Sequence, residues 1–146
     1  MKIPCENQIA SPGQGFHILA DCLKDEAKLA GSVQIVAGLR KALDITIRHA
    51  TSRRAFGSQL SNFDLVKEKL GKCSMQLFAL ESTVYMTAGL HDYQKNPDIC
   101  LEATACRLLA AEVSNFIKDS CKSILGGSTY LSDNNISNLF DDIEGM

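Results

Sequence analysis

Apolar residues recur every three or four positions along most of the chain, which is the period of a helix buried on one face. Residues 16–50 predict a first long helix with the buried stripe Ile18, Cys22, Leu29, Val33, Val36, Leu39, Leu43 and Ile47. The second stripe comprises Val66, Leu70, Cys73, Leu77, Leu80, Val84 and Ala88. The third comprises Ile99, Ala103, Cys106, Ala110, Val113, Ile117 and Ile124.

Polar and glycine residues mark where these helices start and stop. Ser61, followed three residues later by Asp64, resembles a capping signal for the second helix. Asp98 is the expected N-cap of the third helix, and Gly126-Gly127 is expected to end it. In the first helix Ala30-Gly31 allows a bend. A polar turn over 132–135 precedes a short predicted helix over 136–143.

The pattern indicates an all-α fold, an antiparallel bundle of three long helices plus a short C-terminal helix. Residues 1–15, which contain Pro4, Pro12 and Gly13, are expected to be an extended connector to a bundle domain over 16–146. Three single-striped helices leave a fourth position unpaired. We therefore expect self-association or a protein partner, with a complete three-helix domain as the alternative.

Composition narrows the class of protein. The 146 residues are 45% hydrophobic and 22% charged, with a net charge of −2, which favours no nucleic-acid or anionic-membrane partner. No apolar run approaches the ~20 residues of a membrane span. The first seven residues resemble neither a signal peptide nor an Arg-rich transit peptide. The six cysteines and three histidines show no metal-ligand spacing, so we expect no metal and reduced core cysteines.

Several motifs occur in a characteristic order. Pro12-Gly13-Gln14-Gly15-Phe16 precedes the first helix, Arg53-Arg54-Ala55-Phe56-Gly57 joins the first two helices, and Ser123-Ile124-Leu125-Gly126-Gly127 ends the third. Together they resemble the C-terminal helical domain of the acyl-CoA dehydrogenases. Glu68-Lys69-Leu70 and Glu81-Ser82 are nearest to the very-long-chain branch. That branch includes the related mitochondrial complex I assembly factor.

The resemblance implies FAD-dependent α,β-dehydrogenation of fatty acyl-CoA, a step of fatty acid β-oxidation. By position Arg53 would contact the FAD diphosphate of a neighbouring subunit, as a guanidinium suits a phosphate, and Phe56 would pack beside the cofactor. Ser123, Gly126 and Gly127 occupy the family's second cofactor contact. The alternative for Arg53 is a solvated loop cation.

This sequence departs from the family's pattern at three cofactor positions. The usual Gln two residues after the Arg is Ala55, and the Gln before the Gly-Gly turn is Ser123. The turn itself, usually Gly-Gly-x-Gly, reads Gly126-Gly127-Ser128-Thr129. We expect these changes to weaken flavin binding.

The catalytic base of the family is a Glu that removes the α-proton of the substrate. Some members place it on the first helix, and counting from Gly15-Phe16 brings Glu26 to that place. The alternative is that Glu26 belongs to a solvated charge cluster with Asp25 and Lys28. Glu144-Gly145 echoes the Glu-Gly-Thr loop of the very-long-chain branch, but at the wrong distance from Gly126-Gly127.

By this resemblance we expect the family's amino-terminal helical and middle β domains, which supply the acyl pocket and the bed for the flavin, to be absent from these residues. We expect this chain not to oxidise acyl-CoA alone and to meet acyl-CoA only together with those domains. Two hypotheses remain: part of a dehydrogenase, or a non-catalytic helical module for oligomerisation or assembly. By resemblance we expect a dimer or tetramer in the mitochondrion.

Overall fold

The computed structural model describes residues 4–93, 98–131 and 136–145. The expected polar turn over 132–135 lies outside these residues. The helical elements are η1 (Cys5–Asn7), α1 (Gly15–Cys22), α2 (Asp25–Ser52), η2 (Leu60–Asn62), α3 (Asp64–Tyr93), α4 (Cys100–Leu125), η3 (Gly126–Tyr130) and α5 (Ile136–Gly145). Two short strands, β1 (Arg54–Ala55) and β2 (Ser58–Gln59), pair antiparallel.

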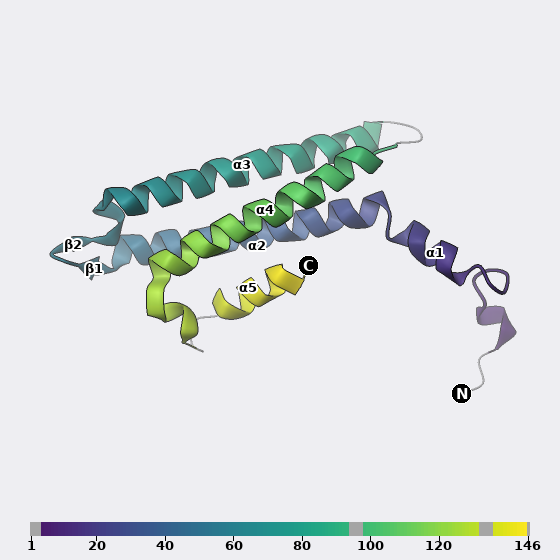
Figure 1. Cartoon of the computed structure of the whole chain (residues 1–146), viewed down its shortest axis with the longest axis horizontal. Coiled ribbons are helices and arrows are strands. Elements are labelled where there is room, and N and C mark those ends of the chain that lie inside the picture. The colour runs from purple at the N-terminus through teal and green to yellow at the C-terminus, as the bar shows by residue number, and fades with distance from the viewer. Residues whose placement is uncertain (1–3, 94–97, 132–135, 146) are drawn as a thin grey trace.

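Helices α2, α3 and α4 lie side by side and alternate in direction, and the shorter α5 lies beside α2 and α4 (Figure 1). The β1–β2 hairpin caps one end of the bundle, where α2 leads into α3. Helix α1 extends away from the opposite end. The prediction of an all-α antiparallel bundle with a short C-terminal helix is confirmed.

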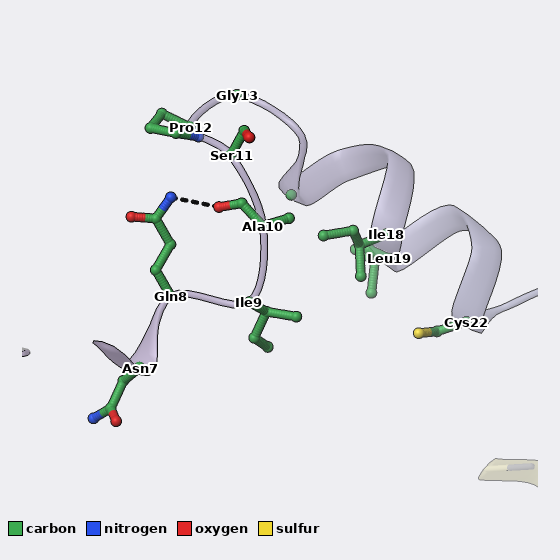
Figure 2. Close-up of a pocket in the computed structure, with 11 residues that line it drawn as sticks. Asn7, Gln8, Ile9, Ala10, Ser11, Pro12, Gly13, Ile18, Leu19 and Cys22 are labelled. Atoms are coloured by element: carbon green, nitrogen blue, oxygen red, sulfur yellow. Dashed lines mark hydrogen bonds between the residues drawn. The ribbon is translucent and has the colours of Figure 1, made fainter. Parts of the chain in front are cut away.

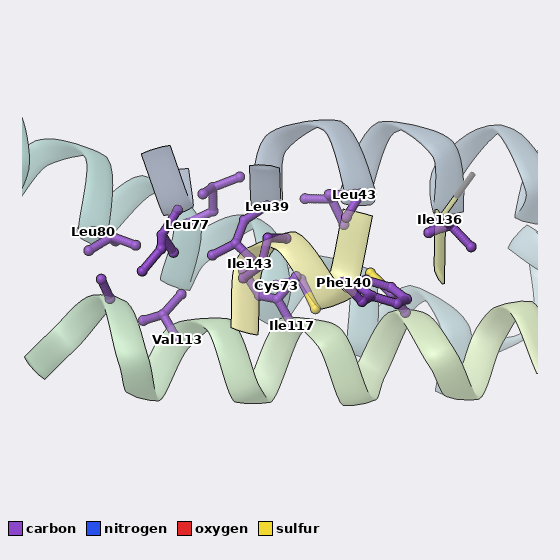
Figure 3. Packing of buried hydrophobic residues seen from close by; sticks show 14 of the residues in the cluster. Leu39, Leu43, Cys73, Leu77, Leu80, Val113, Ile117, Ile136, Phe140 and Ile143 are labelled. Carbon is purple, nitrogen blue, oxygen red and sulfur yellow. The ribbon is translucent and has the colours of Figure 1, made fainter. Parts of the chain in front are cut away.

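The core lies between α2, α3, α4 and α5. Figure 3 shows Leu39 of α2, Leu77 of α3, Ile117 of α4 and Phe140 of α5 meeting in this core. Leu39 and Ile117 are completely buried, and Phe140 is only 2% exposed. Burial of apolar side chains from four elements is the main favourable contribution to this fold.

The predicted stripes of the second and third helices are confirmed, because their members are buried or half-buried in α3 and α4. The stripe of the first helix was wrong at three positions: Cys22 is exposed, Val33 is 47% exposed and Ile47 is 39% exposed. Ser32 and Thr46 are buried in α2. Their hydroxyls donate to the carbonyls of residues 28 and 42 at 2.9 and 2.8 Å, so their burial leaves no unpaired donor.

The predicted single helix over 16–50 is two helices. The break falls at Leu23-Lys24 and not at Ala30-Gly31, which lies inside α2. No residue of α1 is buried, and Phe16 is 77% exposed, so no packing holds α1 in line with α2.

One of the three predicted helix-end signals is confirmed, because Gly126 at φ 60° ends α4. The predicted N-cap of α4 was one residue early: the cap position is Ile99, and the side chain of Asp98 accepts a hydrogen bond from the Cys100 backbone N–H at 3.3 Å. Ser61 was the wrong cap, because it lies in η2 and α3 begins at Asp64. Asp64 still supplies an acid in the first turn of α3.

Candidate cofactor-contact site at one end of the bundle

The hairpin after α2 has an unusual turn. Arg54 pairs with Gln59 and Ala55 with Ser58, which leaves Phe56 and Gly57 as the two central residues. Their φ angles are 52° and 80°, and positive φ at both positions is typical of the type I′ turn that matches the twist of paired strands. Glycine adopts this conformation freely, whereas an L-residue such as Phe does so at a cost of about 1 kcal/mol or more.

Phe56 combines this strained backbone with exposure. Its side chain is 94% exposed, and its ring contacts Phe63 edge-on with the centroids 6.4 Å apart. A bulky residue at positive φ persists where the surrounding structure demands it, and such residues gather at binding sites. The turn therefore presents a large aromatic side chain to a ligand or a neighbouring molecule.

Arg53 lies between α2 and this hairpin, and its backbone is fixed from both sides. Its N–H donates to the His49 carbonyl at 2.8 Å, and its own carbonyl accepts from the Leu60 N–H at 3.0 Å. The side chain is exposed, and the described residues offer its guanidinium no ion-pair partner. A fixed backbone with an exposed guanidinium suits recognition of an anion.

The second predicted contact lies at the same end of the bundle, where α4 gives way to η3 (Figure 1). A Cβ added to Gly126 or Gly127 would meet no atom within 4 Å, so the backbone of this turn is open to close approach. The Ser123 hydroxyl, by contrast, is engaged. It accepts from Lys69 Nζ at 2.7 Å and donates to the Ser120 carbonyl at 2.8 Å.

Glu26 lies at the opposite end of the bundle, in the first turn of α2. The 27 residues that separate it from Arg53 span roughly 40 Å of helix. Its side chain is 84% exposed, and Oε1 lies 3.4 Å from Nε2 of His91 in α3. Its neighbours Lys28 and Asp25 pair with each other at 3.7 Å. The structure thus brings the loop and turn residues to one end and leaves Glu26 at the other.

Glu144 has a structural role in the bundle. Its Oε1 accepts from Lys118 Nζ at 2.9 Å and lies 3.9 Å from Lys122 Nζ. The hydrogen bond from Lys118, followed by the charges of Lys118 and Lys122, lowers the pKa of this carboxyl. Glu144 therefore anchors α5 to α4.

A separate hollow of about 650 Å³ lies in the N-terminal segment, between residues 7–13 and α1. Figure 2 shows Ile9, Leu19 and Cys22 beside it, and a hydrogen bond from the Gln8 side chain to the Ala10 carbonyl. Its lining contains no charged residue and none of the predicted site residues. Its one lining side chain with an ionisable group is the Cys22 thiol.

Sequence reasoning overlooked one surface. We define the outer α3 surface as Met75, Phe78, Tyr85 and Met86, whose exposed fractions are 65%, 72%, 74% and 60%. At 100° per residue these four positions fall on one face of α3. Residues 74–90 contain a single charged residue, Glu81, which Arg40 of α2 binds at 2.6 Å. That uncharged run was the available signal.

Over the part of the chain that the structure describes, no group of His, Cys, Asp or Glu is arranged to hold a metal ion. Within the same residues, no helix has the length and apolarity needed to cross a membrane.

Comparison with known proteins places the chain in a family. The model of the acyl-CoA dehydrogenase C-terminal domain matches residues 13–146. The chain therefore belongs to the acyl-CoA dehydrogenase family, and it corresponds to the C-terminal domain. Of the motif residues that suggested this family, Pro12 lies just outside the match, and those from Gly13 through the Arg53 loop to Gly126-Gly127 lie inside it.

Named relatives agree with this assignment. The very long-chain specific acyl-CoA dehydrogenase of Rattus norvegicus is 29% identical over 148 residues, which cover 98% of this chain and 22% of that protein. The short-chain specific acyl-CoA dehydrogenase of Sus scrofa is 31% identical over 90% of this chain and 32% of that protein. The chain thus spans about a fifth to a third of the length of these relatives.

Solved structures show the same fold. The acyl-CoA dehydrogenase from Geobacillus kaustophilus superposes with a TM-score of 0.87 at 20% identity, over 97% of this chain and 37% of that one. The butyryl-CoA dehydrogenase from Megasphaera elsdenii superposes with a TM-score of 0.84 at 24% identity, over 97% and 36%. The bundle is the α-domain fold shared by these enzymes.

Proposed function

We propose that this chain serves as the C-terminal helical part of an FAD-dependent acyl-CoA dehydrogenase and contributes one side of the cofactor site. In the complete enzyme the reaction is α,β-dehydrogenation of a fatty acyl-CoA. The observation that carries the proposal is the strained, exposed Phe56-Gly57 turn beside the free guanidinium of Arg53. It lies at the same end of the bundle as the open Gly126-Gly127 turn.

The residues at this end fit a diphosphate contact from one side. Arg53 supplies a positive charge and parallel N–H donors on a fixed backbone, and the Phe56 ring can lie against an apolar part of the cofactor. The Gly126-Gly127 backbone has room for an approaching group. When bound, FAD supplies the hydride acceptor; this chain would orient it and cover one face.

The fit is weaker at the positions where the sequence departs from the family. Ala55 has no polar side chain to offer, and the Ser123 hydroxyl is already bound to Lys69 and the Ser120 carbonyl. Arg53 is therefore the main polar contact that this end can provide. We propose that the other domains of the complete enzyme provide the remaining contacts.

The catalytic base is a second part of the proposal. If this chain provides it, Glu26 is the residue that the family resemblance names. Its carboxylate stands in solvent beside His91, so abstraction of an α-proton would require the middle and amino-terminal domains to exclude water around it. Acyl-CoA would bind only in that complete assembly.

The proposed flavin contact is tested by titrating FAD with the full chain and following the change in flavin fluorescence. We expect binding that weakens about tenfold in Arg53→Met, because one charge-assisted phosphate contact is lost. Arg54→Met is the matched control, since it removes a neighbouring exposed guanidinium and should leave binding unchanged. Equal weakening in both variants, or no binding by the native chain, would overturn the contact at Arg53.

A second candidate function, oligomerisation or assembly, is favoured by the outer α3 surface. Helix α3 is 30 residues long, which corresponds to about 45 Å, and its outer face carries no unpaired charge between residues 74 and 90. Four large exposed side chains of this kind approach the roughly 800 Å² per partner of a stable interface. A groove of about 260 Å³ between α2 and α3, lined in part by Val33 and Tyr85, continues this apolar surface.

The partner that we propose for this surface is a second copy of the chain, in a dimer or tetramer. Gly71, Ser82 and Gly89 lie among the large side chains of α3, and small residues let two helices approach closely. The relatives that match include enzymes named as mitochondrial. We propose a mitochondrial location on that similarity, and imaging of the tagged complete protein would test it.

A further inference from the structure

Helix α5 differs from the other helices of the bundle in length and in how it is held. It has 10 residues, whereas α2, α3 and α4 have 28, 30 and 26. An isolated helix shorter than about 12–15 residues is marginal in water. Helix α5 is therefore stable only while it is docked on the bundle, so docking and folding of α5 are one event.

The docking contacts are few and well defined. Ile136, Phe140 and Ile143 follow the helical period and are 0%, 2% and 3% exposed, whereas the opposite face carries Asp141 and Asp142 in solvent. Figure 3 shows the three apolar side chains pointing from α5 into the core. Undocking would release one apolar stripe and leave the longer helices packed on each other.

Ile143 sits in a notch formed by a missing side chain on α2. A Cβ at Gly38 would lie 2.8 Å from Ile143 Cγ1, closer than Cβ atoms come to a neighbour, and at a tight 3.0 Å from its Cδ1, so Ile143 would have to move. Glycine in the middle of a helix otherwise weakens it relative to alanine. Gly38 thus makes α2 weaker in itself and makes room for α5.

An ion pair between a buried lysine and an exposed glutamate holds the same end of α5. The Lys118 side chain on α4 is 6% exposed, and its ammonium donates to Glu144 Oε1 at 2.9 Å. Removal of one partner would leave the other charge unpaired, and for a buried lysine this is costly. Lys122 adds a contact from the same helix, with its ammonium 5.4 Å from the centre of the Phe140 ring.

The start of α5 packs against the η3 turn. Thr129, which is 6% exposed, and Tyr130 line a small hollow together with Ser137 and Phe140 of α5. The η3 turn begins with Gly126, at φ 60°, and Gly127. The η3 turn thus contacts α5 as well as the end of α4.

We propose that α5 is a strap that docks and undocks as a unit on a standing bundle of α2, α3 and α4, held by the Gly38 notch and the Lys118–Glu144 pair, and that its docking orders the η3 turn. The flavin contact of the proposed function would then be set by the strap. The strap itself can be measured without flavin, so the two proposals can fail separately.

Hydrogen exchange of backbone amides in the full chain, resolved by segment, tests the strap. In the native chain we expect amides of 136–145 and 126–131 to exchange together, at least about tenfold faster than the central amides of α2, α3 and α4. Exchange of α5 at the same rate as those central amides would mean that the bundle opens as one unit, and it would overturn the proposal.

Two variants, each with a matched control, test whether the Gly38 notch and the Lys118–Glu144 pair hold α5 on the bundle. Gly38→Ala should speed exchange of α5 and η3 about tenfold while it slows exchange in α2, because alanine favours the helix but collides with Ile143. Gly15→Ala is the control, since it also adds a Cβ to a helical glycine but in α1, where a Cβ meets nothing within 4 Å, and it should leave α5 unchanged. If both variants affect α5 equally, the notch does not hold the strap.

Glu144→Gln should likewise speed exchange of α5 and η3 about tenfold, because Lys118 loses its charged partner. Asp142→Asn removes a charge from the exposed face of the same helix and should have no such effect. If Glu144→Gln and Asp142→Asn change the exchange of α5 and η3 equally, the ion pair does not hold α5. A refolding failure is recognised by fast exchange throughout α2, α3 and α4, which the proposal does not predict.

Discussion

Helices α3 and α4 have similar lengths, but many more residues are buried in α4 than in α3. Helix α4 has 26 residues, eleven of them buried, because it packs against α2 and α3, and Lys118 and Lys122 on α4 also contact α5. Helix α3 has 30 residues with only five buried, yet its outer surface includes Phe78 and Tyr85. Apolar side chains on α4 stabilise the fold of one chain. The apolar side chains of the outer α3 surface do not stabilise the single chain, and we attribute them to contact with a second copy of the chain.

The largest expected effect concerns the buried face of α4. Ile117→Ala removes a completely buried side chain from α4 and should lower the free energy of unfolding by about 2–5 kcal/mol. Leu108→Ala, at a position of α4 that is 65% exposed, should change it by no more than about 0.5 kcal/mol. Urea unfolding at low protein concentration measures both. Similar losses would mean that the assigned core of α4 is wrong.

The next effect concerns the outer surface of α3. Phe78→Asp should weaken self-association by about a hundredfold, since a central aromatic contact is replaced by a charge that must be desolvated. Leu19→Asp, on α1 outside the bundle, is the control for adding an acid at an exposed apolar position. Sedimentation over a range of concentrations measures the association. An unchanged Phe78→Asp variant would exclude this surface as the interface.

The smallest expected effect tests whether water is excluded from the interface between α3 and α4. Burial raises the pKa of the Cys121 thiol to about 11, and burial also raises the pKa of Cys73. The Cys121 thiol ionises near pH 9 in the unfolded chain and near pH 11 in the folded chain. Its contribution to the free energy of unfolding is therefore fully present below pH 9 and is lost as the pH rises toward 11.

The expected loss is about 2 kcal/mol between pH 9 and 11, as two pKa units correspond to slightly more than that. Cys121→Ala should flatten the pH dependence of urea unfolding, with a smaller slope remaining from Cys73. Cys100→Ala, at an exposed position, should not change the slope. A slope that is the same in all three proteins would show that Cys121 is reached by water.

The elements that could be predicted from the sequence are those in which the apolar period coincides with the buried positions. The α3 and α4 stripes were readable because most of their core positions are apolar, and the Gly126 stop because only glycine easily takes its conformation. The first helix was less readable, since Ser32 and Thr46 fill core positions by bonding their own backbone. A hydrophobic pattern does not register such residues.

The candidate site was predicted in part. The motif order located Arg53, Phe56 and the Gly126-Gly127 turn, which the fold brings to one end of the bundle. The positive φ of Phe56 and the capture of Ser123 by Lys69 depend on contacts between distant segments, so spacing could not reveal them. Their contribution to flavin binding stays a prediction, as does the role of Glu26.

One measurement tests the central claim that this chain is one side of an assembled flavin site: size-exclusion chromatography with light scattering after incubation with excess FAD. The account predicts a peak with a mass at least twice the 15.9 kDa of one chain, with flavin absorbance following the protein across the peak. A folded species of 15.9 kDa that elutes without flavin would contradict it.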